Sequence, residues 1–170
     1  MPARSNRREF QENLAQRLQE AARGERLRSA LGVMSGQERW LFDLAEAGAI
    51  VPLTPLIGVP LTMHWFVGIA KVRGTLYSVV DFSAFCGSGQ SNRGSDARLL
   101  LIGGTQGSAL LVDRTLGLRR LDGMRLENAQ QPPRHPWMGE DFRDEQGQLW
   151  HSVRIKQLLA HPDFLSVGLQ

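Results

Sequence analysis

The sequence predicts a mainly β protein, and two observations lead to that prediction. From Leu27 onward the apolar runs are short and are separated by glycine and proline, a pattern typical of sandwiches and barrels built from many strands. Between these runs only short helical pieces fit, and a longer helix is expected only near the N-terminus. The expected strands cover residues 29–35, 39–44, 49–53, 65–72, 75–82, 98–104, 108–113, 116–121 and 148–154.

The N-terminal segment is expected to form one helix. Asn6 and Glu9 have the spacing of a capping box, and Gly24 suits the position after a helix end. The apolar side chains of this helix form one narrow stripe, made of Phe10, Leu14, Leu18 and Ala21. The stripe fits either a helix packed on its own domain or a helix that binds a partner. A second, short helix is expected around Ile155–Leu159, ending before Pro162.

Two polar stretches are interpreted as linkers. Residues 86–97 are rich in glycine and serine, and residues 127–148 are rich in proline and acidic at their end. The first stretch suggests two β subdomains that divide near residue 90. The expected organisation is an N-terminal extension over residues 1–26, a main domain over 27–160 with that division, and a C-terminal tail over 161–170.

The charge of the chain is concentrated at one end. The isoelectric point is about 9.7, but residues 1–30 carry seven arginines and four glutamates, which gives 7 − 4 = +3 and accounts for the whole net charge. The remaining residues carry 13 basic and 13 acidic side chains and are balanced. A protein that binds nucleic acid through its folded body usually has a basic stripe there. We therefore expect no nucleic-acid partner.

Composition also limits the compartment and the kinds of site. The single cysteine, Cys86, excludes an intramolecular disulfide and a cysteine-clustered zinc site. No apolar run reaches the roughly 18 residues that a membrane span needs. The charged start MPARSNRREF lacks the apolar region of a secretory signal. A cytoplasmic protein without direct membrane insertion is expected.

The motifs of common enzymes are missing from the sequence. The glycine-rich stretch 87–95 lacks the Lys-Ser/Thr pair of a phosphate-binding loop, and no G-x-S-x-G is present. The four histidines have no metal-ligand spacing, and His151 fits an ordinary strand position. The acidic cluster is interpreted as a solvated loop face; its members are Glu140, Asp141, Asp144 and Glu145. No catalytic residue, cofactor or metal is expected, and the protein is predicted not to be an enzyme.

The stretch FVGIAKVRGTLYSVVDF, residues 66–82, is predicted to be a hairpin. Its strands would be Phe66–Arg73 and Leu76–Phe82, joined at Gly74-Thr75 in a type II′ turn. Strand alternation then places two apolar and two cationic side chains on one face, namely Val67, Ile69, Lys71 and Arg73. Asp81 is expected to cap a short helix that ends at Gly87.

This hairpin resembles the signature of CheW-like domains. In that family an apolar strand leads into Asn-Leu-Arg-Gly, and a second strand ends in Pro-Val-Val-Asp-Leu. The motif's Arg, Gly and Asp are retained as Arg73, Gly74 and Asp81, whereas Lys71 replaces its Asn and Ser78 its Pro. The similarity covers about residues 27–159. Within the family, the segments REFQENLAQRL and HPWMGEDFRDEQGQLWHSVRIKQLLAHPDFL resemble PilI-type adaptors of type IV pilus (twitching motility) systems.

The resemblance implies a fold and a role. CheW-like domains consist of two intertwined five-stranded SH3-like β-barrels. They are non-catalytic adaptors that couple the cytoplasmic tip of a methyl-accepting chemoreceptor to the regulatory domain of a CheA-type histidine kinase. For a PilI-type protein the kinase would be ChpA/PilL-like, and the protein would associate with receptors at the inner membrane face. The expected partner-binding residues are Val67, Ile69, Lys71, Val72, Arg73 and Gly74.

Two other functions remain open from the sequence. The isoelectric point and the basic N-terminal segment also fit a small β-barrel that binds nucleic acid, which would show salt-dependent binding. An enzyme with a dispersed site would need a polar pocket around residues such as His151 or Asp113.

Overall fold

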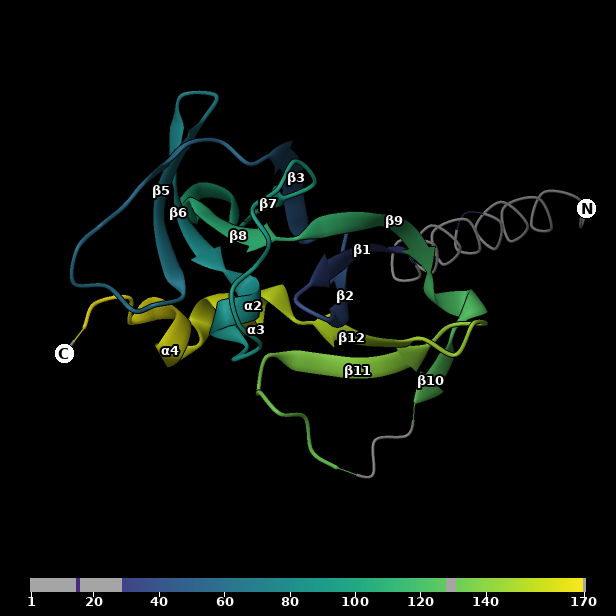
Figure 1. Ribbon diagram of the computed structural model, residues 1–170. Helices are drawn as coiled ribbons and strands as arrows, with labels where there is room; N and C mark the ends of the chain where they lie inside the picture. Colours follow the sequence, from purple (N-terminus) through teal and green to yellow (C-terminus); the bar gives the residue numbers. More distant parts are fainter. Residues whose placement is uncertain (1–14, 16–28, 128–130, 170) are drawn as a thin grey trace, which may run out of the picture.

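The computed structural model describes residue 15 and residues 29–127 and 131–169. The helix predicted at the N-terminus lies outside these residues, apart from the single position 15. Figure 1 shows two β-sheets with short helices packed beside them. No helix in the described ranges is long and apolar enough to cross a bilayer.

Each sheet contains six strands. The first has the spatial order β10 (Arg125–Glu127), β11 (Met138–Arg143), β12 (Leu149–Val153), β2 (Glu38–Asp43), β1 (Ser29–Ser35) and β9 (Arg114–Arg120). The second has the order β3 (Ala47–Pro52), β7 (Arg98–Ile102), β8 (Ser108–Val112), β6 (Thr75–Asp81), β5 (Phe66–Val72) and β4 (Leu56–Ile57). The resemblance implied five strands in each half; the count of six includes one very short edge strand in each sheet, β10 or β4.

Both sheets are antiparallel except at one ladder each. Strand β12 pairs in parallel with β2, and β6 pairs in parallel with β8. The described helices are short: α2 (Phe82–Phe85), α3 (Ile155–Ala160) and α4 (Pro162–Leu165), with 3-10 turns at Gly104–Gln106 and Leu121–Gly123. The nine strands expected from the sequence all occur, with bounds that differ by a few residues.

The chain passes from one sheet to the other at two places. It leaves the first sheet after β2 and returns to it between β8 and β9. The glycine- and serine-rich stretch near residue 90 therefore connects α2 to β7. The strands before and after it, β6 and β7, both belong to the second sheet, so the chain does not change sheet there. Composition identified a loop there correctly, but strand pairing determines which strands belong together.

The segment 127–148, interpreted from its sequence as a linker, contains strand β11. Met138, the first residue of β11, and Trp137 just before it are buried in the main core, with exposed fractions of 3% and 1%. Apart from Phe142, the remaining residues of β11 are polar or glycine, and all of them are half-buried or exposed, which is why the stretch resembled a loop. Asp144 also differs from a solvated loop residue, because its carboxylate accepts a hydrogen bond from Trp150 Nε1 at 2.8 Å.

One core joins the two sheets. Its aromatic centre is Phe82 of α2, which is fully buried and whose ring contacts Trp40 and Phe42 of β2 at 5.0 and 5.6 Å between centroids. Leu100 and Leu110 of the second sheet belong to the same buried cluster. Burial of this apolar area stabilises the two sheets as one unit.

Asp81 begins α2 as the sequence predicted. The side chain is fully buried and accepts a hydrogen bond from Ala84 N at 3.2 Å, the N-cap interaction. It also accepts bonds from Ser91 N at 2.9 Å and Ser91 Oγ at 2.7 Å. Gly87, with a φ of +78°, follows the helix end and donates to Ala84 O. The motif aspartate therefore organises the buried start of the loop that leads to β7.

Candidate functional site

The β5–β6 hairpin has a tighter turn than the sequence predicted. Val72 pairs with Thr75, so the two loop residues are Arg73 and Gly74, with φ values of +50° and +83°. Positive φ at both central positions defines a type I′ turn, in place of the expected type II′ turn at Gly74-Thr75. Arg73 therefore lies in the turn itself and not on the strand. Figure 1 shows this tip projecting from the second sheet.

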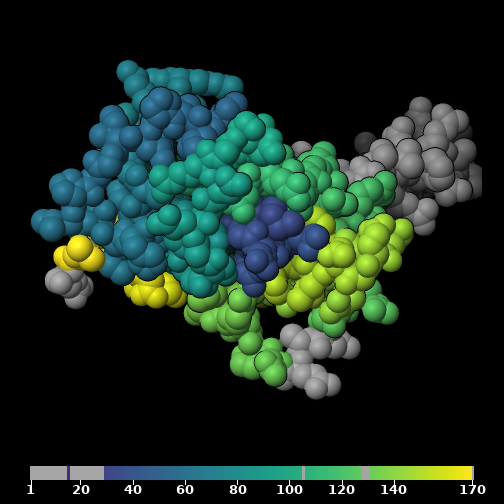
Figure 2. Space-filling view, in the orientation of Figure 1, coloured from purple at the N-terminus to yellow at the C-terminus, as the bar shows by residue number. Residues whose placement is uncertain are grey.

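The outer face of the hairpin carries the predicted cations beside apolar side chains. Lys71 and Arg73 are exposed, and Ile69 is half-buried. Lys71 lies opposite Leu76, which is 60% exposed, and Ile69 lies opposite Ile57 of β4, which is 67% exposed. We call this set the hairpin-tip surface: Ile57, Ile69, Lys71, Arg73 and Leu76. The space-filling view shows the tip as a ridge on the molecule (Figure 2).

Two of the six predicted residues point inward. Val72 is only 6% exposed and belongs to the buried cluster of the second sheet. Val67 packs against the same cluster and not beside Ile69, because a β-bulge between Phe66 and Gly68 shifts the alternation of β5. Gly74 is exposed in the turn. Val72 and Val67 hold the hairpin, and the surface that a partner can reach is formed by the others.

The cations of the hairpin tip are available for a partner. Within the described part of the chain, neither the Lys71 nor the Arg73 side chain makes a hydrogen bond or an ion pair. Sequence reasoning missed the two most exposed apolar members, Ile57 and Leu76. A type I′ turn at residues 73–74 places residue 76 opposite residue 71, so the turn type was the missing signal for Leu76. No comparable signal existed for Ile57, since β4 has only two residues.

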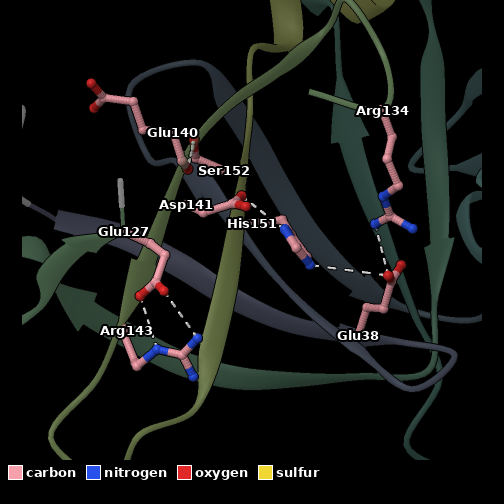
Figure 3. Close-up of polar contacts among 8 residues, drawn as sticks. All are labelled: Glu38, Glu127, Arg134, Glu140, Asp141, Arg143, His151 and Ser152. Atoms are coloured by element: carbon pink, nitrogen blue, oxygen red, sulfur yellow. Dashed lines mark hydrogen bonds and ion pairs between the residues drawn. The ribbon is translucent and has the colours of Figure 1, made fainter. Parts of the chain in front are cut away.

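A polar cluster around His151 is the other arrangement with possible chemistry (Figure 3). His151 Nδ1 lies 2.8 Å from Asp141 Oδ1, and Nε2 lies 4.0 Å from Glu38 Oε1. Glu38 also pairs with Arg134 at 2.7 Å. The imidazole borders a surface pocket of about 800 Å³ between β11, β12 and the segment that contains Arg134.

The contacts of this cluster stabilise the fold and do not form a catalytic arrangement. The hydroxyl of the neighbouring Ser152 donates to the Glu140 carbonyl at 2.6 Å, so it is not directed at the imidazole as a nucleophile would be. Arg143 binds Glu127 at 2.9 Å, and this contact holds the pKa of Glu127 below its usual range. These contacts tie β10, β11, β12 and the start of β2 together.

Asp113 and Cys86, two further side chains with possible reactivity, are held in hydrogen bonds or buried. Asp113 accepts bonds from Gly36 N at 2.9 Å and Asn92 N at 2.6 Å, so it fastens two loops at the edge of a pocket of about 510 Å³. Burial raises the pKa of the Cys86 thiol far above its usual value, which keeps it protonated and unreactive. In the described residues no group of three or more His, Cys, Asp or Glu side chains is arranged to hold a metal ion.

Comparison with known proteins identifies the family. The family model of the CheW-like domain matches residues 29–163, so the chain belongs to the CheW-like domain family. The solved structure of the scaffolding protein TtCheW from Thermoanaerobacter tengcongensis is similar, with a TM-score of 0.68 and 14% identity. The match covers 84% of this chain and 99% of that one, and it shows a shared fold. A comparison with curated protein sequences finds no match.

Membership of this family defines the class of the protein. CheW-like proteins are scaffold adaptors of chemosensory signalling and are non-catalytic, so this chain is not an enzyme. The pockets beside His151 and Asp113 therefore do not represent the dispersed active site that the sequence left open.

Proposed function

We propose that this chain couples a methyl-accepting chemoreceptor to a CheA-type histidine kinase, and that it uses the hairpin-tip surface to bind one of them. The observation that carries the proposal is the pairing of exposed apolar and cationic side chains on one projecting hairpin: Ile57, Ile69, Lys71, Arg73 and Leu76. Interfaces concentrate binding energy in a few apolar and arginine side chains that become desolvated together. The neighbouring motif residues Gly74 and Asp81 are the ones that resemble the family signature.

The direct test is titration of the purified chain with the kinase regulatory domain and, separately, with the cytoplasmic tip of the receptor. We expect saturable binding to both and weaker binding of at least one after Arg73→Glu. A desolvated arginine contact contributes about 2 kcal/mol or more, whereas an exposed one contributes about 1 kcal/mol at most. Loss of more than about thirtyfold in affinity would place Arg73 at the centre of the interface, because 2 kcal/mol is that factor.

Arg93→Glu is the matched control, because Arg93 is exposed and lies in the loop before β7, outside the hairpin. Circular dichroism must show that both variants are folded. Equal affinities of the wild type and Arg73→Glu for both partners would remove the hairpin tip from the interface. Absence of binding to either partner by the folded wild type would contradict the coupling function itself.

We further propose that the system controls type IV pilus twitching motility, with a ChpA/PilL-like kinase as partner and a cytoplasmic location at receptor clusters. The support is the resemblance of the N-terminal segment and of the stretch 135–165 to PilI-type adaptors. Deletion of the gene should abolish twitching and leave flagellar swimming unchanged. The reverse result would assign the chain to a flagellar system.

A further inference from the structure

A third surface cavity lies beside α4, apart from the hairpin tip and from the pockets near His151 and Asp113. Its volume is about 520 Å³, within the range of roughly 300–1,000 Å³ typical of small-molecule sites. Four segments form it: the residues before β5, the end of α2, the segment before β11, and the region around α4. Figure 1 shows α2, α3 and α4 close together in this part of the molecule. The lining residues that matter for binding are Trp65, Phe85, His135, Trp137, His161 and Asp163.

The inner wall of this cavity is aromatic and held in place. The rings of Trp65 and Phe85 meet edge to face at 5.1 Å, and Phe85 lies 6.0 Å from Trp137. His135 stacks on Trp137 at 4.9 Å with its plane tilted by only 7°. Trp65 and Trp137 are almost fully buried, so the part of the wall that a ligand can reach belongs mainly to the half-buried Phe85 and His135. Such a wall favours a flat apolar group, because aromatic rings gain from stacked and edge-to-face contacts.

The cavity has one carboxylate and no lysine or arginine among its lining residues in the described part of the chain. The carboxylate is that of Asp163, whose side chain is 82% exposed and whose Oδ2 lies 3.8 Å from His161 Nδ1. The nearby Arg134 is engaged by Glu38. Burial, with Arg134 and His161 adding to it, lowers the pKa of His135 and so disfavours its protonated form. The other titratable groups at the cavity are His64 and His161.

We propose that this cavity binds a small organic amine, with an apolar ring against the aromatic wall and an ammonium group directed at Asp163. Aromatic faces attract cations, and the exposed Asp163 carboxylate, which has only the His161 imidazole at 3.8 Å as an ion-pair neighbour, adds to that attraction. A carboxylate ligand of the same size would meet the Asp163 charge and no lysine or arginine among the lining residues. The proposal concerns a site separate from the hairpin tip and does not depend on kinase or receptor binding.

The test is titration of the full-length, ¹⁵N-labelled chain with 2-phenylethylamine and, as the matched anion, 3-phenylpropionate. Each of the four tryptophans gives its own indole N–H signal. We expect saturable shifts of the Trp65 and Trp137 signals with the amine and little change at Trp40 and Trp150. Asp163→Asn should weaken amine binding about two- to fivefold, the size of an exposed ion pair.

Asp96→Asn is the control, because Asp96 is exposed and lines a different pocket; it should leave amine binding unchanged. Three outcomes would overturn the proposal: no saturable shift with the amine, equal affinity for the amine and the carboxylate, or an unchanged amine affinity in Asp163→Asn. None of these readouts involves the kinase or the receptor, so a failure here is distinct from a failure of the adaptor function.

Discussion

Arg73 occupies a backbone conformation that residues other than glycine, asparagine and aspartate rarely adopt. Its φ of +50° lies in the left-handed region, which costs roughly 1–2 kcal/mol. Asn-Gly is the preferred pair for a type I′ turn, and this turn has Arg-Gly. Arg73 is exposed, strained and without a side-chain partner in the described residues. These features are expected of a side chain whose contacts form only when a partner binds.

We therefore predict that Arg73→Asn raises the free energy of unfolding by about 0.5–1 kcal/mol, because asparagine tolerates the left-handed region. Urea denaturation followed by circular dichroism measures the change. In the same variant, partner affinity should fall, since the cation is gone. A loss of stability would instead mean that the Arg73 side chain stabilises the free fold.

Asp81 is a residue whose role is structural. Its buried carboxylate accepts bonds from Ala84 N, Ser91 N and Ser91 Oγ. In Asp81→Asn the amide NH₂ would face one of these donors and leave it unsatisfied. We predict a loss of about 2–4 kcal/mol in the free energy of unfolding, because buried donors without acceptors are costly. Urea denaturation of Asp81→Asn and of the exposed control Asp96→Asn tests this; equal midpoints would contradict it.

At the scale of the element, the bulge in β5 depends on one glycine. Gly68 has a φ of +130°, and a Cβ there would lie only 2.2 Å from the Ile57 carbonyl oxygen of β4. Gly68→Ala must therefore displace β4, and with it the exposed Ile57 of the hairpin-tip surface. We predict a destabilisation of roughly 2–4 kcal/mol by thermal or urea unfolding.

Gly58→Ala is the control for this prediction. A Cβ at Gly58 meets no atom within 4 Å, although the residue lies directly after β4. Its stability should change by less than about 0.5 kcal/mol. If both alanine variants unfolded at the wild-type midpoint, the contact between Gly68 and Ile57 would not constrain the strand.

The β11–β12 turn gives the fold a dependence on pH. Burial opposes ionisation of Asp144, but bonds from Trp150 Nε1, Gln148 N and Gln146 N prevail and lower its pKa. A carboxylate whose pKa is lower in the folded than in the unfolded state stabilises the fold. The full contribution is present at pH values above the unfolded-state pKa, about 3.9, and it is lost as the pH falls through the folded-state pKa. We predict that Asp144→Asn is less stable than wild type at pH 7 and that the difference shrinks below about pH 4. Denaturant midpoints across this range measure it; a constant difference would contradict the prediction.

At the scale of the molecule, the sequence predicted elements better than their assembly. The nine expected strands and the Asp81 cap depend on local patterns, which adjacent residues carry in full. The membership of β7 and β8 in the sheet of β3 and β6 depends on pairing between residues far apart in the chain, and no local pattern records it. Strand β11 was missed because most of its side chains are polar, and its apolar residues Met138 and Phe142 are too far apart to give a strand pattern.

For the candidate site, too, the sequence predicted the local features and missed those that depend on long-range pairing. The motif identified Lys71, Arg73 and Gly74 as neighbours at a turn, and the structure places them there. Ile57 reaches the same surface only because β4 pairs with β5, a contact between segments separated by a loop. The inward orientation of Val67 follows from a bulge that depends on the close approach of the Ile57 carbonyl to Gly68, a feature of the assembled sheet.

The core shared by the two sheets determines how the whole molecule is expected to unfold. Phe82 contacts Trp40 and Phe42 of the first sheet and belongs to the cluster that includes Leu100 and Leu110 of the second. Because this cluster buries apolar surface from both sheets, unfolding of either sheet would expose apolar surface of the other. We predict a single two-state unfolding transition for the described domain.

Two probes with different coverage test this. Fluorescence is weighted toward the first sheet, since Trp40 and Trp150 lie on it and Trp137 directly precedes β11, whereas far-ultraviolet circular dichroism reports both sheets. Their urea midpoints should coincide, and Phe82→Leu should shift both equally, by an amount equivalent to about 1–3 kcal/mol. Separate midpoints, or a shift of one probe alone, would mean that the sheets unfold independently. Coincident midpoints would place the hairpin tip and the cavity beside α4 on one cooperative folding unit.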